Sequence, residues 1–264
     1  VGGVWTQVGN DIATEASYNE SGHVVSSHSV SLSGDGSVVA FGVVTSYDNK
    51  TLCGHVRIYQ NVNGTWTQVG NDIVGEAAYD QSGYSVSLSS DGSVVAIGAA
   101  GNDGNGENSG HVRIYQNVNG TWIKIGDDID GESRYDQSGS TVSLSSDGSI
   151  VAIGAWLNEG NDWNGSKRGH VRIYQNVDGA WSQIGDDIDG KKRIAQSGTS
   201  VSLSANGSVV AIEALDYYEG YRQYGHALIY TTLNQAPTAI ALSSTSFLEI
   251  IPGGQWIATL STTD

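Results

Sequence analysis

Short stretches of alternating polar and apolar residues recur along this chain and predict β-strands. Residues 85–89 alternate serine with Val86 and Leu88, and this period of two is typical of a strand. An Asp91-Gly92 pair follows, which favours a hairpin turn because both residue types tolerate positive φ. Residues 94–97 are then apolar throughout, as expected for a strand that is buried on both faces.

The same unit continues with two further predicted strands. A loop rich in glycine and asparagine leads to residues 111–116, which alternate apolar and polar positions again. An Asn119-Gly120 turn pair then precedes a fourth strand at residues 122–125. Because no stretch of the chain has a helical apolar period, the pattern predicts an all-β protein built from four-stranded units.

This unit is repeated along the chain, and three series of strings show it. Gly-His-Val-Arg-Ile-Tyr-Gln begins at residues 54, 110 and 169, and a decayed copy begins at residue 225. Ser-Val-Ser-Leu-Ser or a close variant begins at residues 29, 85, 141 and 200. A tryptophan followed by Val-Gly or Ile-Gly after two residues stands at positions 5, 66, 122 and 181. Four-stranded units repeated in tandem predict the blades of a β-propeller.

Four blades are expected in residues 1–232, with repeats at about 21–76, 77–132, 133–191 and 192–232. The last repeat has only three predicted strands, whereas the chain opens with a lone tryptophan strand at residues 4–9. Residues 1–20 could therefore close a ring of four blades by pairing with the last one. The alternative is that they end an earlier blade of a larger propeller, since the chain holds no methionine and starts within a repeat.

The C-terminal segment breaks this pattern. Asn234-Gln235-Ala236-Pro237 leads to two short predicted strands at residues 238–242 and 255–260. We expect residues 233–264 to form a linker and the start of a separate β-domain. The stretches 236–243 and 259–264 resemble the beginning of a bacterial cadherin-like repeat, a domain found in long secreted surface proteins.

The segment Gly83–Ala99, with the sequence GYSVSLSSDGSVVAIGA, resembles the FG-GAP repeat of integrin-like propellers and has the cadence of WD40 blades. The resemblance extends over about residues 21–232. It implies a propeller fold and an extracellular binding or adhesion module. The calcium loop of FG-GAP blades needs several acidic residues at alternate positions, and the Ser-Ser-Asp-Gly-Ser around Asp91 departs from that pattern.

Composition and charge exclude several functional classes. The chain of 264 residues carries 12 basic and 28 acidic residues, for a net charge of −16. This balance argues against nucleic acid or anionic lipid as a partner, because both require clusters of lysine and arginine. No apolar run is long enough for a membrane span, and the single Cys53 offers no disulfide within the chain.

Two acidic regions are candidates for binding Ca²⁺, the one cofactor that the sequence suggests. Asp103, Asn105 and Glu107 place oxygen ligands at alternate positions of a loop, as in the opening of a calcium loop. Asp127, Asp128 and Asp130 cluster in a segment that recurs at residues 186–190. The simpler interpretation of the second cluster is a turn between blades, where aspartates cap backbone amides.

The long loops are the candidate contact surface, because loops of a propeller gather on one face. Trp156 and Trp163 lie in or beside one such loop, together with Asn158 and Asn164. Exposed indoles beside polar side chains suit a sugar ring, so these four residues are the candidate ligand-binding residues. The alternative is that Trp163 packs against its own loop.

No catalytic motif is recognisable, so the chain is not expected to be an enzyme. One histidine recurs in each repeat, and we interpret it as a residue that holds a turn at the start of a strand. We therefore expect a secreted or surface-exposed module for adhesion or ligand binding, with a protein or glycan as partner and no membrane insertion. The alternative is a structural building block of an extracellular fibre, sheath or particle that contacts copies of itself.

Overall fold

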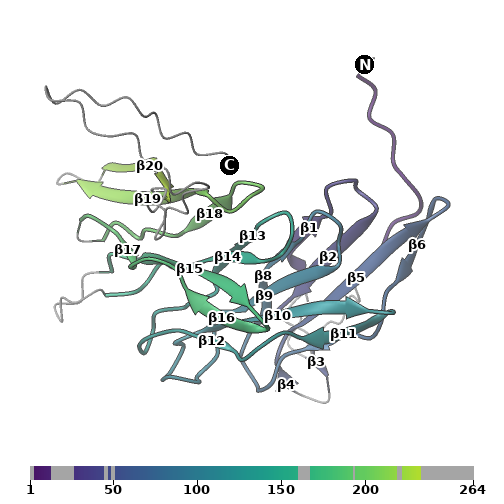
Figure 1. Cartoon of the computed structure of the whole chain (residues 1–264). Helices are drawn as coiled ribbons and strands as arrows, with labels where there is room; N and C mark the ends of the chain where they lie inside the picture. The colour runs from purple at the N-terminus through teal and green to yellow at the C-terminus, as the bar shows by residue number, and fades with distance from the viewer. Residues whose placement is uncertain are drawn as a thin grey trace, which may run out of the picture. The chain divides into compact units, whose positions relative to one another are not determined.

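The computed structural model describes residues 3–12, 27–44, 47–48, 51–159, 167–192, 194–218 and 222–232, and every regular element in them is a strand (Figure 1). The chain divides into two units, Val1–Thr231 and Thr232–Asp264. Only Thr232 of the second unit is described, so the predicted cadherin-like segment lies outside the described residues. The described part contains no helix with the length and apolar character of a membrane span.

The first unit contains four antiparallel sheets, which we call blades 1 to 4 in chain order. Blade 1 contains β1 (Ser27–Leu32), β2 (Val38–Val43), β5 (His55–Val62) and β6 (Thr65–Gln68). Blade 2 contains β8 (Ser82–Leu88), β9 (Val94–Ala99), β10 (His111–Val118) and β11 (Thr121–Lys124). Blade 3 contains β13 (Thr141–Leu144), β14 (Ile150–Ala155), β15 (His170–Val177) and β16 (Ala180–Gln183). The predicted four-stranded β-propeller blades are confirmed.

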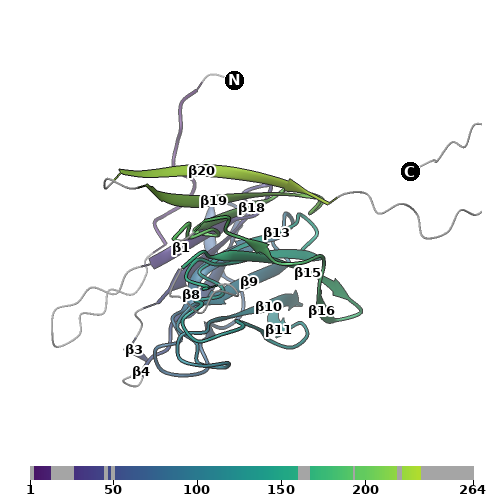
Figure 2. The same cartoon turned by 90° about the vertical axis from the view of Figure 1, so that its left-hand side faces the viewer.

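Blade 4 has three strands, as the sequence predicts: β18 (Ser200–Leu203), β19 (Val209–Tyr218) and β20 (Arg222–Thr231). Figure 2 shows β19 and β20 as a long hairpin beside β18. A separate two-stranded pair, β3 (Tyr47–Asp48) and β4 (Thr51–Leu52), lies in the loop between β2 and β5.

Blades 1 to 3 each carry a fifth, two-residue strand that the sequence does not predict. These strands are β7 (Ile73–Val74), β12 (Ile129–Asp130) and β17 (Ile188–Asp189), and each pairs with the start of the third long strand of its blade. They occupy the acidic segments that we expected to be turns. Each contains one isoleucine that packs inward. Two residues are too few to show a period of two, so the apolar pattern does not reveal these strands.

The expected closure by the N-terminal strand is not seen in the described residues. Residues 3–12 form no strand, Trp5 is fully exposed, and β20 pairs only with β19. Instead, the carbonyl of Val8 accepts a hydrogen bond from the indole of Trp66 in blade 1. This is the position that the end of one blade takes against the next, as described below for Val69 and Trp122. The N-terminal segment thus matches the end of a preceding blade.

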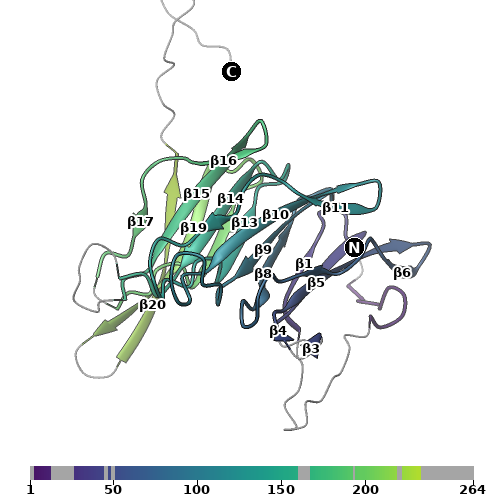
Figure 3. The same cartoon turned by 90° about the horizontal axis from the view of Figure 1, so that it is seen from below.

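The core lies between blades and explains why the second strand of each blade is continuously apolar. In β9, Val95 and Ile97 pack against residues of blade 1, whereas Val94 and Ala96 pack against residues of blade 3. Both faces of the strand are therefore buried, as the unbroken apolar run predicts. Figure 3 shows the sheets of blades 1 to 3 following one another face to face.

Serine hydroxyls connect the first strands of neighbouring blades. Ser87 accepts a hydrogen bond from the backbone amide of Leu144, and Ser85 donates one to the carbonyl of Gly139. Equivalent bonds join blade 1 to blade 2 through Ser29 and Ser31, and blade 3 to blade 4 through Thr141 and Ser143. The serines that alternate with valine and leucine therefore hold the blades together.

A close backbone approach accompanies these hydroxyl bonds. Gly98 in β9 faces the carbonyl oxygen of Gly139 in the next blade, and a Cβ added to Gly98 would lie far inside van der Waals contact with that oxygen. Gly42 and Gly154 make the same approach in blades 1 and 3. In blade 4 the equivalent position, opposite the first residue of β18, is Glu213.

The turn between the first two strands of each blade is held by one acidic or amide side chain. In blade 2, Asp91 accepts hydrogen bonds from Ser89 and from the amide and hydroxyl of Ser93. Hydrogen bonds from the Ser37 amide and from the Ser37 and Ser33 hydroxyls lower the pKa of the equivalent Asp35 to about 2. Burial works to raise the pKa of Asp91, but its serine hydrogen bonds outweigh burial and lower it. Asn206 makes the same contacts in blade 4 without a charge.

Gly98→Ala should lower the free energy of unfolding by about 1–3 kcal/mol, because the new methyl group forces β9 away from the Gly139 carbonyl. Urea unfolding followed by circular dichroism measures this loss. Gly3→Ala is the matched control, since no atom lies within 4 Å of the added Cβ there. A Gly98→Ala variant as stable as the wild type would show that the blades do not approach this closely.

Stability should fall as the pH drops from about 4 to 2, because Asp35, Asp91 and Asp147 have lowered pKa values in the folded chain. The unfolded chain then takes up protons first, so the contribution present at neutral pH is lost with acidification. Replacing all three by asparagine, which blade 4 already uses at Asn206, should keep the turns and flatten this part of the profile. Melting temperature against pH measures the effect, with Asp178→Asn as the control.

Candidate functional sites at the blade junctions

A tryptophan in the outer strand of each of blades 1 to 3 fastens that strand to the preceding segment. The indole Nε1 of Trp122 donates to the carbonyl oxygen of Val69 at 2.9 Å, and that of Trp181 donates to Ile125 at 3.0 Å. Gly70 lies beneath the edge of Trp122 with φ +71°, where a Cβ would come within 3.0 Å of the ring. The Trp-x-x-(Val/Ile)-Gly string therefore encodes the tryptophan of one junction and the glycine of the next.

An open groove lies beside each of these tryptophans. The first has a volume of about 420 Å³ and lies between Asn71–Val74 of blade 1 and Tyr115 and Trp122 of blade 2. The equivalent groove at the next junction has about 250 Å³, between Asp127–Asp130 and the pair Tyr174 and Trp181.

A third groove, of about 250 Å³, repeats the arrangement with Asn10–Ile12 against Tyr59 and Trp66. Three consecutive grooves thus present one tryptophan, one tyrosine and an asparagine or aspartate. This combination offers ring faces for stacking and polar groups for hydrogen bonds, as small-ligand sites do.

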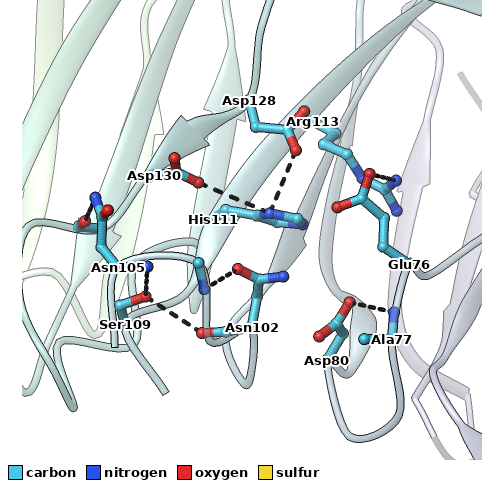
Figure 4. A network of polar contacts seen from close by, with 12 residues as sticks. Glu76, Ala77, Asp80, Asn102, Asn105, Ser109, His111, Arg113, Asp128 and Asp130 are labelled. Carbon is cyan, nitrogen blue, oxygen red and sulfur yellow. Dashed lines mark hydrogen bonds and ion pairs between the residues drawn. The ribbon is translucent and has the colours of Figure 1, made fainter. Parts of the chain in front are cut away.

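A network of charged residues lies next to the grooves, at the start of each third strand (Figure 4). His111 is buried at the start of β10, with its Nδ1 3.7 Å from Oδ2 of Asp128 and 4.0 Å from Oδ1 of Asp130. Figure 4 shows Glu76 of blade 1 on the other side of the ring, where it pairs with Arg113 at 3.2 Å. Burial, followed by the charge of Arg113, lowers the pKa of His111, so its imidazole is neutral at pH 7.

The next junction repeats this network with different residue numbers. His170 Nδ1 lies 3.7 Å from Oε2 of Glu132 and 3.8 Å from Oδ2 of Asp187. Burial and the charge of Arg172 lower the pKa of His170 to about 4. Burial also raises the pKa of Glu132, although Arg172 opposes this shift.

Blade 1 differs, because its aspartate is already paired. Oδ2 of Asp72 accepts a hydrogen bond from Nε of Arg57 at 2.9 Å, while Nε2 of His55 lies 3.9 Å away. Glu15, which corresponds to Glu76 in the repeat, lies outside the described residues, so the described part of this junction shows the pair of Asp72 with Arg57.

The predicted calcium ligands of the loop at 103–107 each have another partner. Asp103 accepts a hydrogen bond from the amide of Asn108, and the side chain of Asn105 donates to the carbonyl of Gly131. Glu107 is held by Tyr135 and Arg134, which lower its pKa. The structure uses these side chains to fix the loop, and calcium binding by Asp103, Asn105 and Glu107 stays a prediction.

The predicted cluster of Asp127, Asp128 and Asp130 lies partly in the second groove and partly in the charged network around His111. All three line the second groove, and Asp128 also receives a hydrogen bond from Lys124 at 2.5 Å. Asp127 is exposed, whereas Asp128 and Asp130 both face His111. The sequence singles out Asp128 as a candidate metal ligand, which stays a prediction, and its neighbours His111 and Glu76 were not expected there.

The structure describes two of the four predicted ligand-binding residues. Asn158 is buried at 6% exposure and hydrogen-bonds Asp136, so it supports its loop from the inside. Trp156 is half-buried. Trp163 and Asn164 lie outside the described residues. The tryptophans that line grooves are instead those of the repeated strand, at positions 66, 122 and 181.

Comparison with known proteins gives one match at the level of a family. Residues 75–115 match the FG-GAP repeat. The match covers β8, β9 and the first part of β10 in blade 2, and of the two aromatic residues of the first groove it includes Tyr115 but not Trp122. No curated protein sequence matches the chain.

Among solved structures, the chain is similar to a candidate TolB from Agrobacterium tumefaciens, at 11% identity and a TM-score of 0.44 over 81% of this chain and 66% of that one. A hypothetical selenium-binding protein from Sulfolobus tokodaii matches at 14% identity and a TM-score of 0.42, over 58% of this chain and 38% of that protein. A candidate 6-phosphogluconolactonase from Bacteroides uniformis matches at 12% identity and a TM-score of 0.38, over 76% and 73%. Scores this low carry no argument about function.

Proposed function

We propose that the chain is a non-catalytic binding module of the cell exterior, and that its blade-junction grooves bind a glycan with repeating units. The observation that carries the proposal is the recurrence of one aromatic groove at three consecutive junctions. The FG-GAP match supports a module of the extracellular type. Its blade architecture is a common scaffold for binding surfaces.

The chemistry of each groove suits a sugar. Tyr115 and Trp122 are half-buried, so each ring has one side on the protein and part of its surface toward solvent. The indole nitrogen of Trp122 is already bonded to Val69, which leaves the ring face as its binding surface. Exposed Asn71 and Asp127 add groups that can hydrogen-bond hydroxyls.

Repetition of the groove favours a repetitive ligand. Each groove is shallow and open, so a single sugar unit would bind weakly. A chain that enters three equivalent grooves gains avidity, because the second and third contacts form within one complex. A polysaccharide or a densely glycosylated surface satisfies this requirement.

Trp122→Ala should weaken binding to the glycan selected from an array by about fivefold to twentyfold, as expected for the loss of a central aromatic contact. Surface plasmon resonance measures the affinity, and a melting curve confirms that the variant is folded. Asn71→Ala should reduce affinity by a smaller factor without affecting stability, since its side chain is exposed.

Trp5→Ala is the matched control, because Trp5 is fully exposed and lines none of the three grooves. Equal binding by wild type, Trp122→Ala and Asn71→Ala would contradict the proposal, as would an array without any bound glycan.

A second candidate function is a structural building block that contacts copies of itself, and one observation favours it. In the described residues, β20 pairs only with β19, so its other edge presents backbone groups without a strand partner. Ile229 in this strand is 66% exposed. An exposed apolar edge strand is a template for pairing with another chain.

If this second function holds, electron microscopy should show filaments or a lattice, and Ile229→Lys should abolish them by placing a charge in the strand contact. Ile123→Lys is the matched control, since Ile123 is 50% exposed in the outer strand of blade 2. A wild-type chain that stays monomeric at high concentration would exclude the building-block function.

A further inference from the structure

Two consecutive blade junctions contain the same three potential metal ligands. At the first, a carboxylate oxygen of Glu76, an imidazole nitrogen of His111 and a carboxylate oxygen of Asp128 all lie within 4.8 Å of one another. At the second, Glu132, His170 and Asp187 repeat this arrangement. In each case the glutamate comes from one blade, and the histidine and aspartate come from the next.

At the second junction, the separations between the histidine and the carboxylates are longer than hydrogen bonds and slightly longer than those between the ligands of a zinc ion. At the second junction, His170 Nδ1 is 3.7 Å from Glu132 Oε2 and 3.8 Å from Asp187 Oδ2. Hydrogen bonds between such groups are about 2.7–3.2 Å long. Ligands placed tetrahedrally at about 2.0–2.2 Å from a zinc ion are about 3.3–3.6 Å apart. A small inward movement would therefore produce a coordination shell.

The carboxylate oxygen that does not face the histidine is bonded to, or paired with, a residue outside these groups of three ligands. Oδ1 of Asp187 accepts a hydrogen bond from Gln183 at 2.7 Å, and Oε1 of Glu132 faces Arg172 at 3.6 Å. At the first junction, Lys124 binds Oδ1 of Asp128 in the same way. These partners turn the remaining oxygen toward the histidine, as outer partners of metal ligands do.

Both histidines are buried among these carboxylates. The side chains of His111 and His170 are each 2% exposed, and Nε2 of His111 is buried without a hydrogen-bond partner. A buried imidazole nitrogen without a hydrogen bond, such as Nε2 of His111, is an expensive arrangement unless another group completes it.

The local charge also favours a cation. At the second junction, Glu132, Asp136, Asp187 and Asp189 act together with the positive charges of Arg172 and Arg168. At the first junction, Glu76, Asp80, Asp128 and Asp130 lie around His111, with Arg113 and Lys124 nearby. Acidic groups outnumber basic groups at both junctions.

We propose that each of these two junctions binds one divalent transition-metal ion through an imidazole nitrogen and two carboxylate oxygens, and that the ion bridges two blades. The nitrogen ligand selects an ion of the Zn²⁺ type over Ca²⁺, which takes oxygen ligands. Three protein ligands leave a position for water or for an oxygen atom of a ligand in the adjacent groove. Metal binding by the three protein ligands does not require the proposed glycan binding.

Isothermal titration of the metal-free, untagged chain with Zn²⁺ tests the proposal. We expect two ions per chain, a melting temperature that rises with Zn²⁺ concentration, and no comparable effect of Ca²⁺. His170→Gln and His111→Gln should each remove one ion. Asp187→Asn, which keeps the shape of the side chain, should weaken the second site at least tenfold.

Two controls keep the test specific. His28→Gln should leave two ions bound, because His28 is exposed, bonds the carbonyl of Tyr84 and belongs to neither group of ligands. Cys53→Ser should also leave two ions bound, which excludes the thiol as a ligand. Cobalt provides a second measurement, since Co²⁺ in a site of low symmetry gives visible absorption that the His170→Gln variant should lose in part. Zn²⁺ binding that neither His111→Gln nor His170→Gln reduces, or equal stabilisation by Ca²⁺, would overturn the proposal.

Discussion

The contact between the first strands of adjacent blades is the constraint on which the rest of the molecule depends. A hydroxyl such as that of Ser85 must reach the carbonyl of Gly139, and this requires that Gly98 carry no side chain. The same requirement recurs at the other two junctions, where Ser29 or Thr141 supplies the hydroxyl and Gly42 or Gly154 leaves the space. The chain's high glycine content is in part a result of this close approach.

Close contact on the inner strands has a consequence for the outer strands. The blades share apolar cores near β1, β8 and β13, whereas grooves lie beside the outer strands β6, β11 and β16. One indole hydrogen bond per junction fastens the outer strand, as for Trp122 and Val69. Tyr115 and Trp122 pack against the apolar core and also line the first groove, and the buried histidines with their acidic partners lie next to the grooves. Both proposed binding functions therefore lie beside the apolar core, at the outer part of the junctions.

The sequence predicts the long strands because they show either a period of two or, as in β9, an unbroken apolar run, and because turn pairs such as Asp91-Gly92 separate several of them. It does not predict the short strands, since β12 has only one apolar residue, Ile129, and no period can be seen in two residues. The candidate site is predicted only in part. Asp128 could be singled out by its acidic neighbours, but His111 lies 17 residues before it and Glu76 comes from another blade. Only the packing of blades brings the three together. Glu107 pairs with Arg134, a contact that its own loop sequence does not reveal.

Glu213 distinguishes blade 4 from the other three blades. It occupies in blade 4 the place of Gly42, Gly98 and Gly154, and it is exposed. A further blade could not dock on this face through the same backbone approach, because the glutamate side chain fills the space that the approach needs and would leave a carboxylate buried beside a carbonyl oxygen. Blade 4 thus resembles the polar capping unit that terminates a solenoid, where an end repeat keeps the inner fold of its neighbours but replaces the residues that would recruit another copy. By this reasoning the repeats are not interchangeable: exchanging blade 4 with blade 2 would move the cap to the interior and separate the array at that point.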